Sequence, residues 1–96
     1  MAEARIRLRN PVKGKAGPTV AREKYELVRT EILAALPKAP PGIALEDLKR
    51  AMVKRVGKRL RPGSHDWWTM AAKLHLEATG EIKRIADAPQ RLVRAR

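Results

Sequence analysis

One predicted helix, running from Ser64 to Gly80, constrains the fold of this chain more than any other segment. Ser64 suits an N-cap, Asp66 in the first turn suits the positive end of the helix dipole, and Gly80 suits the C-terminal end. At about 100° per residue, the polar side chains form one narrow row, consisting of Asp66, Thr69, Lys73 and Glu77. A surface helix ordinarily has a much wider polar face. This helix therefore has two apolar sides and needs neighbours on both.

The two apolar sides have different expected roles. Trp68, Ala72 and Leu76 lie on one arc, which we expect to face the core. The other side needs a cover from the N-terminal segment, the C-terminal hairpin or a second copy of the protein, and it consists of Trp67, Met70, Ala71, Leu74 and Ala78. Trp67, Trp68, Leu74 and Leu76 are thus predicted to be core or interface residues. The alternative is that one tryptophan stacks on nucleic-acid bases or lines a partner's groove.

Prolines and glycines divide the rest of the chain into further elements. Residues 1–18, with the alternating R-I-R-L-R, predict a basic extended N-terminal arm or an edge strand. We expect one helix from a Thr19 cap to just before Pro37, and a second from about Leu45 to Val56. Their apolar stripes are Tyr25, Val28, Ile32, Leu33 and Leu36, and Leu45, Leu48, Met52 and Val56. The runs E-I-K-R-I-A and R-L-V-R-A-R predict a C-terminal hairpin with Pro89 in its loop.

Three helices followed by a hairpin are the layout of a winged helix–turn–helix domain, in which the hairpin is the wing. The predicted fold class is therefore α+β and mainly helical, with the arm at 1–18 and a winged-helix domain at 19–96. The short strand that usually precedes the second helix of such domains is expected at Gly42-Ile43-Ala44. A chain of 96 residues fits one small domain, and its core must be mainly aliphatic because it has no Phe, one Tyr and two Trp.

Several motifs together resemble a known family. They are N-P at 10–11, K-Y-E-L-V-R-T-E-I-L-A-A-L-P at 24–37, P-G at 41–42 and W-W-T-M-A-A-K-L-H-L-E-A-T-G at 67–80. The chain resembles a family of small uncharacterised bacterial proteins described as winged-helix-like, and the paired tryptophans followed by L-x-L-E-A-x-G are its most specific element. The chain departs from that pattern at Ala44, where a Thr cap is usual, and at His75, where Asp is usual. The resemblance implies a winged-helix fold and no particular activity.

The chain is strongly basic, with 22 Lys and Arg against 10 Asp and Glu, a formal net charge of +12 and a pI near 11.2. Such a balance is typical of proteins whose partners are polyanions. The positive charge is concentrated at the two ends of the chain and in the K-R-L-R-P-G turn before the third helix. We therefore expect binding to double-stranded DNA, mainly through its phosphates, by a transcriptional regulator or a nucleoid-type accessory protein.

The predicted DNA contacts lie on either side of the third helix rather than along it. Phosphate contacts are expected from the preceding turn, the helix N-terminus and the wing, namely from Lys58, Arg59, Arg61, Ser64, Lys83, Arg84, Arg91 and Arg94. On the helix, only Thr69 and Lys73 are expected to reach a groove. Arg5, Arg7 and Arg9 of the arm are expected to enter a minor groove. Two alternatives stay open: a merely solvated basic face, or an interaction module that uses the Trp67/Leu74 face for a protein partner or a homodimer.

Patterns of catalysis and metal binding are absent from the sequence. It has no cysteine and no G-x-G-x-x-G, G-K-[ST] or G-x-S-x-G motif. His65 and His75 are too far apart for a helical metal pair; we expect His65 on the surface and His75 at the margin of a packed face. We expect no enzymatic activity, no cofactor and no metal. No apolar run approaches the roughly 18 residues of a membrane span, and the N-terminus lacks a secretion signal, so a cytoplasmic location is expected, at the nucleoid if DNA is bound.

Overall fold

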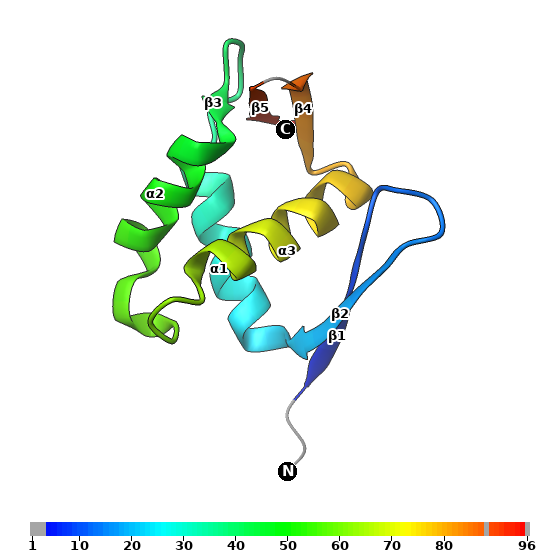
Figure 1. Cartoon of the computed structure of the whole chain (residues 1–96), viewed down its shortest axis with the longest axis vertical. Coiled ribbons are helices and arrows are strands. Elements are labelled where there is room, and N and C mark those ends of the chain that lie inside the picture. Colours follow the sequence, from blue (N-terminus) through cyan, green and yellow to red (C-terminus); the bar gives the residue numbers. More distant parts are fainter. Residues whose placement is uncertain (1–3, 88, 96) are drawn as a thin grey trace.

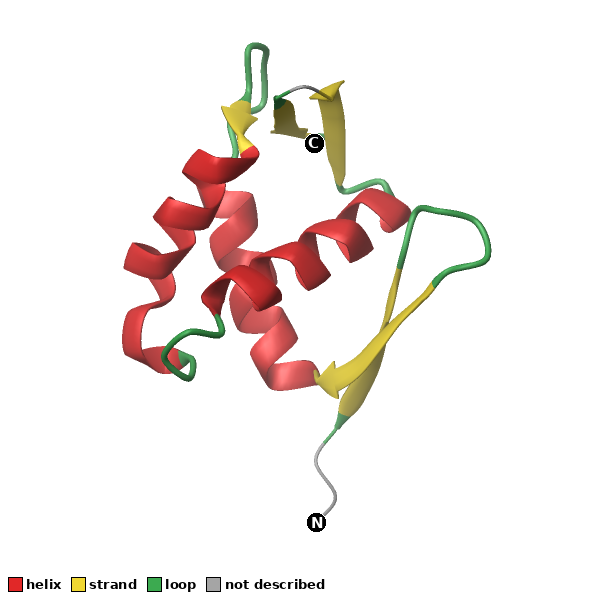
Figure 2. Cartoon of the chain, in the orientation of Figure 1, coloured by secondary structure: helices red, strands yellow, loops and turns green. Residues whose placement is uncertain are grey.

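The computed structural model describes residues 4–87 and 89–95, so that residues 1–3, 88 and 96 of the predicted arm and C-terminal hairpin lie outside the described residues. Two hairpins flank three helices along the chain, and Figure 2 shows the two small sheets as separate units around the helices. The elements in Figure 1 are β1 (Arg5–Arg9), β2 (Ala16–Ala21), α1 (Arg22–Ala35), β3 (Ile43–Ala44), α2 (Leu45–Val56), a 3₁₀ turn (Gly57–Arg59), α3 (His65–Thr79), β4 (Ile82–Asp87) and β5 (Gln90–Arg94).

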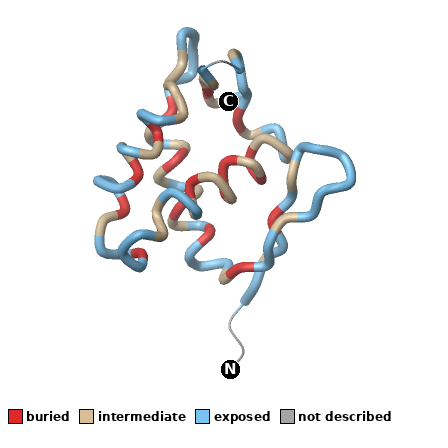
Figure 3. Tube along the Cα trace, viewed as in Figure 1, coloured by how far each residue is buried: buried red, intermediate tan, exposed pale blue. Residues whose placement is uncertain are grey.

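The three helices pack pairwise around one aliphatic core, and the buried parts of the trace in Figure 3 face inward along each of them. The helical stripes predicted from the sequence are confirmed: α1 buries Tyr25, Val28 and Ile32 with Leu36 just beyond it, and α2 buries Leu48, Met52 and Val56. Leu33 and Leu45 are partly buried and pack against this core. On α3, Ala72 and Leu76 are fully buried, which confirms the arc predicted to face inward.

The N-terminal segment is a packed hairpin. The strand predicted as the alternative for R-I-R-L-R is confirmed at Arg5–Arg9, whereas the extended arm predicted over residues 1–18 is wrong for the described part of that segment. Strand β1 pairs with β2 in antiparallel fashion, with Ile6 opposite Val20 and Arg7 opposite Thr19. The alternation R-I-R-L-R explains this arrangement, because successive side chains of a strand point to opposite faces. Leu8 is 1% exposed and joins the core, while the arginines face solvent. A two-stranded hairpin is marginal alone, so this burial is what holds it in place.

Helix α1 begins later than the sequence predicts. Thr19 lies within β2, the helix starts at Arg22 after Ala21, and no side chain caps it. The buried Val20 accounts for the difference, because its place in the hairpin keeps the backbone extended through Ala21. Arg22 N–H then donates to Ala4 O at 2.9 Å, which ties the start of β1 to the first turn of the helix. Helix α2 also lacks a side-chain cap, since Ala44 precedes it.

The C-terminal hairpin forms a three-stranded antiparallel sheet with the short strand before α2, in the order β3-β5-β4. Strand β3 lies at the predicted position, and Pro89 lies in the turn between β4 and β5 as expected. Gly42 has a φ of +71°, and a Cβ there would collide with the carbonyl of Leu92, so only glycine fits. Arg94 N–H donates to Pro37 O at 2.9 Å and fastens the sheet to the end of α1.

Over the described residues the chain is therefore a small α+β protein with three α-helices and two sheets, and roughly half of it is helical. The predicted order of three helices and then a hairpin is incomplete, because strands also precede the helices. The consequence for any binding site is that the most basic segment of the chain is held against α3 and α1 by the core.

Candidate nucleic-acid interface

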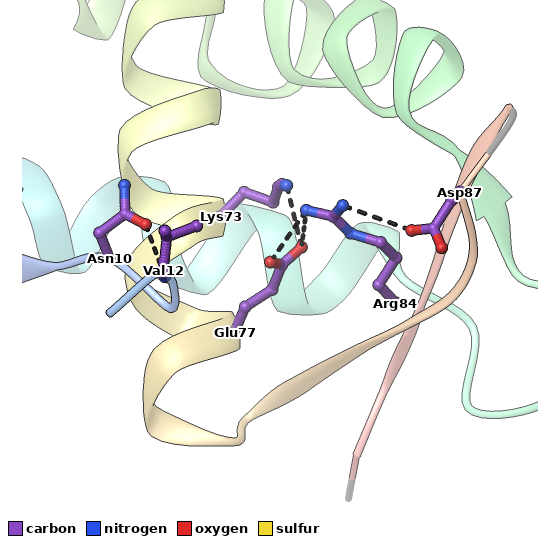
Figure 4. Close-up of polar contacts among 6 residues, drawn as sticks. All are labelled: Asn10, Val12, Lys73, Glu77, Arg84 and Asp87. Carbon is purple, nitrogen blue, oxygen red and sulfur yellow. Dashed lines mark hydrogen bonds and ion pairs between the residues drawn. The ribbon is translucent and has the colours of Figure 1, made fainter. Parts of the chain in front are cut away.

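The middle of the polar row of α3 is buried, contrary to the prediction that Thr69 and Lys73 reach a DNA groove. Thr69 is 1% exposed and Lys73 is fully buried. Lys73 Nζ lies 2.9 Å from Glu77 Oε1, and Glu77 also pairs with Arg84 of β4 at 3.2 Å (Figure 4). Burial lowers the pKa of Lys73, and the Glu77 carboxylate opposes this shift. Neither Thr69 nor Lys73 is available to contact a base edge in this structure.

The exposed face of α3 is apolar instead. Trp67 is 51% exposed, and the remaining residues of its stripe are partly buried: Met70, Ala71, Leu74 and Ala78. Trp67 is therefore not a core residue, while Trp68 is partly buried against the core. The two indole rings meet edge to face with their centroids 5.2 Å apart. The N-terminal hairpin lies along one side of α3 (Figure 1), while Trp67 at the start of the helix stays half exposed.

A hollow of about 310 Å³ lies where the first turn of α1 approaches the start of α3, and it is lined by Lys24, Arg61, Ser64, Trp67 and Trp68. Ser64 precedes the helix as predicted, but its hydroxyl donates to Arg61 O at 2.6 Å and does not cap the helix. Lys24 is absent from the predicted site residues. Nothing near it in the sequence marks it, because only the packing of α1 on α3 brings it beside the tryptophans.

The hairpin carries a cluster of five basic side chains with no acidic neighbour in the sequence. Between Ala4 and Arg22 the sequence has no acidic residue. The predicted arm residues Arg5, Arg7 and Arg9 are all exposed on the outer face of β1, and the loop that follows exposes Lys13 and Lys15. None of these five forms an ion pair within residues 4–87 and 89–95.

The other predicted contact residues are less available. Arg59 donates to Val56 O at 3.2 Å and pairs with Glu31, and Arg84 is shared between Glu77 and Asp87. Arg91 donates to the carbonyls of Pro41 and Gly42, and Arg94 is partly buried. Lys58, Arg61 and Lys83 are exposed and make no ion pair in the described part of the chain. The structure therefore shifts the free charge from the C-terminal hairpin toward the N-terminal one.

Both histidines make structural hydrogen bonds. His75 is 7% exposed, more buried than the predicted margin of a packed face, and its Nδ1 accepts a hydrogen bond of 2.8 Å from Arg9 N–H. Its ring also meets Tyr25 edge to face. Burial lowers the pKa of His75, and the charge of Arg9 lowers it further against an opposing effect of Glu81. His65 is partly buried, and its Nε2 lies 2.8 Å from Gly57 O, so it is not the surface residue that the sequence predicts.

Within the described residues, no three His, Cys, Asp or Glu side chains are grouped closely enough to hold a metal ion. None of the helices in the same part of the chain has the length and apolar character needed to cross a membrane.

Comparison with known proteins places the chain in a family without identifying an activity. Neither a curated protein nor a solved structure matches it significantly. A family model described as a family of unknown function, DUF6958, matches residues 5–92, which is nearly the whole chain. The chain therefore belongs to this family of unknown function.

Proposed function

We propose that this protein is a winged-helix protein that binds double-stranded DNA, mainly through the phosphate backbone. The order α1, β3, α2, α3, β4, β5 and the sheet order β3-β5-β4 support the winged-helix assignment, with β4 and β5 as the wing. In this proposal the N-terminal hairpin is an addition to the winged helix and its principal phosphate-binding element.

The observation that carries the proposal is the row of arginines on β1. Arg5, Arg7 and Arg9 are exposed on one face of a strand fixed to the core through Leu8. Alternate residues of a strand lie about 6.8 Å apart. A row of cations along one strand can therefore meet neighbouring phosphates of a DNA backbone, which is a closely spaced row of negative charges. A rigid row of cations binds phosphates at a lower entropic cost than a flexible arm.

The burial of Thr69 and Lys73 on α3 limits sequence reading. Thr69 and Lys73 would be the groove-reading residues of a standard recognition helix, but both are covered. Phosphate contacts carry no direct sequence information. We therefore propose weak sequence preference, which fits a nucleoid-type accessory protein better than a regulator of a single site.

The test is a fluorescence-anisotropy titration of two blunt duplexes of unrelated sequence, between about 50 and 200 mM salt. We expect similar affinity for both and a steep loss with salt. The double variant Arg7→Gln/Arg9→Gln should reduce the slope of log K against log salt by about 1.8, because each lost phosphate contact contributes about 0.9.

The matched control is Lys38→Gln/Lys54→Gln, which removes the same charge from two exposed residues far from the hairpin in the sequence. It should change the slope much less. If the two double variants are equivalent, only net charge matters and the hairpin is not the contact element. If neither duplex binds at the lower salt concentration, the DNA-binding proposal is wrong.

A second candidate function is a protein–protein interaction module, favoured by the apolar exposed face of α3. A stripe of Trp67, Met70 and Leu74 without a charged residue is unusual on a solvent-facing helix. Sedimentation of the wild type and of Leu74→Asp tests it. A dimer that the substitution dissociates supports this function, and a wild-type monomer argues against self-association through this face.

A further inference from the structure

We infer that the hollow bounded by Trp67 and Trp68 binds one unpaired nucleotide of a DNA strand, so that the protein favours a duplex with a single-stranded overhang over a blunt one. This inference rests on the proposed DNA-binding function and names the class of DNA that suits it best.

The hollow has an exposed aromatic surface. Of the three Trp and Tyr side chains, Tyr25 is buried, Trp68 is partly buried, and Trp67 alone is half exposed. The Trp67 ring meets Trp68 edge to face, and Trp68 packs against the core. An exposed indole supported in this way is a stacking platform for any base, because every base has a π face.

Two positively charged side chains lie beside the indole rings. Lys24 from α1 and Arg61 from the turn before α3 line the same hollow, and neither makes an ion pair within the described residues. Nearby Arg55 and Arg59, in contrast, both pair with Glu31. A planar ring beside two free cations matches a base with its adjoining phosphate. An acidic peptide would use the cations and leave the indole face uncovered.

The hollow is small enough to select a single nucleotide. Its volume of about 310 Å³ is at the lower end of the range for small-molecule sites. A single nucleotide suits this space better than a helix or a strand of a protein partner. The base must also be unpaired, because a paired base has its faces covered by its neighbours in the stack.

The hollow is connected to the N-terminal hairpin through the first turn of α1. Strand β2 passes directly into α1, and Arg22 N–H bonds to Ala4 O, so the start of β1 lies at the first turn of α1 (Figure 1). Lys24 lies in that same turn. The arginines of β1 and the hollow are therefore joined through the first turn of α1. A duplex bound along β1 has its strand end within reach of the tryptophans.

The experiment measures DNA affinity by the fluorescence anisotropy of end-labelled DNA and base stacking by tryptophan emission, because both tryptophans of the protein line the hollow. The ligands are a short blunt duplex, the same duplex with an oligothymidine overhang, oligothymidine alone and thymidine monophosphate. We expect the overhang duplex to bind more tightly than the blunt duplex and to quench the emission strongly. Thymidine monophosphate should quench only at much higher concentration, because it lacks the hairpin contacts.

Substitution at Trp67 provides the specific test. Trp67→Ala should weaken binding of the overhang duplex by about 5- to 150-fold, the range for loss of one stacked base, and leave blunt-duplex binding unchanged. Trp67→Phe should recover part of the loss. Val53→Ala, at an exposed apolar residue of α2, is the control and should have no effect. Since Trp67 is half exposed, circular dichroism should show that each variant remains folded.

The outcomes separate this inference from the proposed function. Equal affinity for blunt and overhang duplexes, with no quenching, would overturn the inference while DNA binding stands. An equal loss for both duplexes in Trp67→Ala would also overturn it. Quenching by oligothymidine without any duplex binding would support the nucleotide site and refute the proposed binding to duplex DNA. No binding of any of the four ligands would overturn both.

Discussion

Replacing Leu8 by alanine tests whether the N-terminal hairpin is part of the folded domain. The Leu8 side chain is 1% exposed and belongs to the same buried cluster as Val28, Ile32 and Leu76. Core Leu→Ala substitutions cost about 2–5 kcal/mol, and the cost falls where the surroundings can relax. Because Leu8 lies on a two-stranded hairpin at the edge of the core, we expect a loss of about 2–3 kcal/mol in the free energy of unfolding.

The assay is urea denaturation followed by circular dichroism, together with thermal melts. For a domain of this size, a loss of about 2–3 kcal/mol lowers Tm by roughly 8–24 °C. Val12→Ala is the matched control, since Val12 lies in the hairpin loop and is 53% exposed. It should change the free energy of unfolding by less than about 0.5 kcal/mol. If Leu8→Ala is no more destabilising than Val12→Ala, the segment is a free arm in solution and the argument for a rigid arginine row fails.

Three further predictions concern the interior. The free energy of unfolding should decrease as pH falls below about 6.5, the ordinary pKa of histidine. The pKa of His75 is lowered in the folded state, so the unfolded chain takes up the proton first. Protonation of the ring also removes the acceptor for Arg9 N–H. Denaturation of the wild type and of His75→Gln at neutral and mildly acidic pH checks this, and an unchanged pH dependence in the variant would contradict it. Glu77→Gln should lower the free energy of unfolding by about 3–5 kcal/mol in denaturant melts, because it leaves the charge of Lys73 buried without its partner. A loss below about 1 kcal/mol would show that Lys73 reaches solvent or deprotonates. Gly42→Ala should lower Tm by several degrees, because φ is positive there and the added Cβ collides with Leu92 O. Gly14→Ala, in an open loop, is the control that measures the cost of a positive φ alone. Equal losses of Tm in the two variants would argue against the collision.

The sequence predicts the helices and their buried stripes well, because helical periodicity depends only on the local order of apolar residues. Ala72 and Leu76 on α3, and Val28 and Ile32 on α1, face the core as their spacing predicts. The strand before α2 and the turn at Pro89 are also located correctly. These elements follow from local patterns of side-chain type and from the limits that proline places on the backbone.

The sequence does not predict the burial of Lys73, because its polarity indicates a solvent-facing row. Its burial depends on Glu77 one turn later and on Arg84 from β4, which completes the network. Thr19 likewise fits an N-cap by residue type, but the burial of Val20 keeps that stretch in a strand. In both cases a contact distant in the sequence overrides a local preference. For the same reason the hollow at Trp67 is visible only once α1 and α3 are packed together.

The central claim is that the hairpin β1–β2, rather than the exposed face of α3, contacts the DNA backbone. Backbone amide NMR shifts recorded during titration with a blunt duplex test this claim most directly. We predict that the largest shifts fall on Arg5–Arg9 and on the loop at 10–15, with small shifts at Thr69 and Lys73 inside the fold. Shifts concentrated on α2 or on the middle of α3, with the hairpin unaffected, would contradict the account.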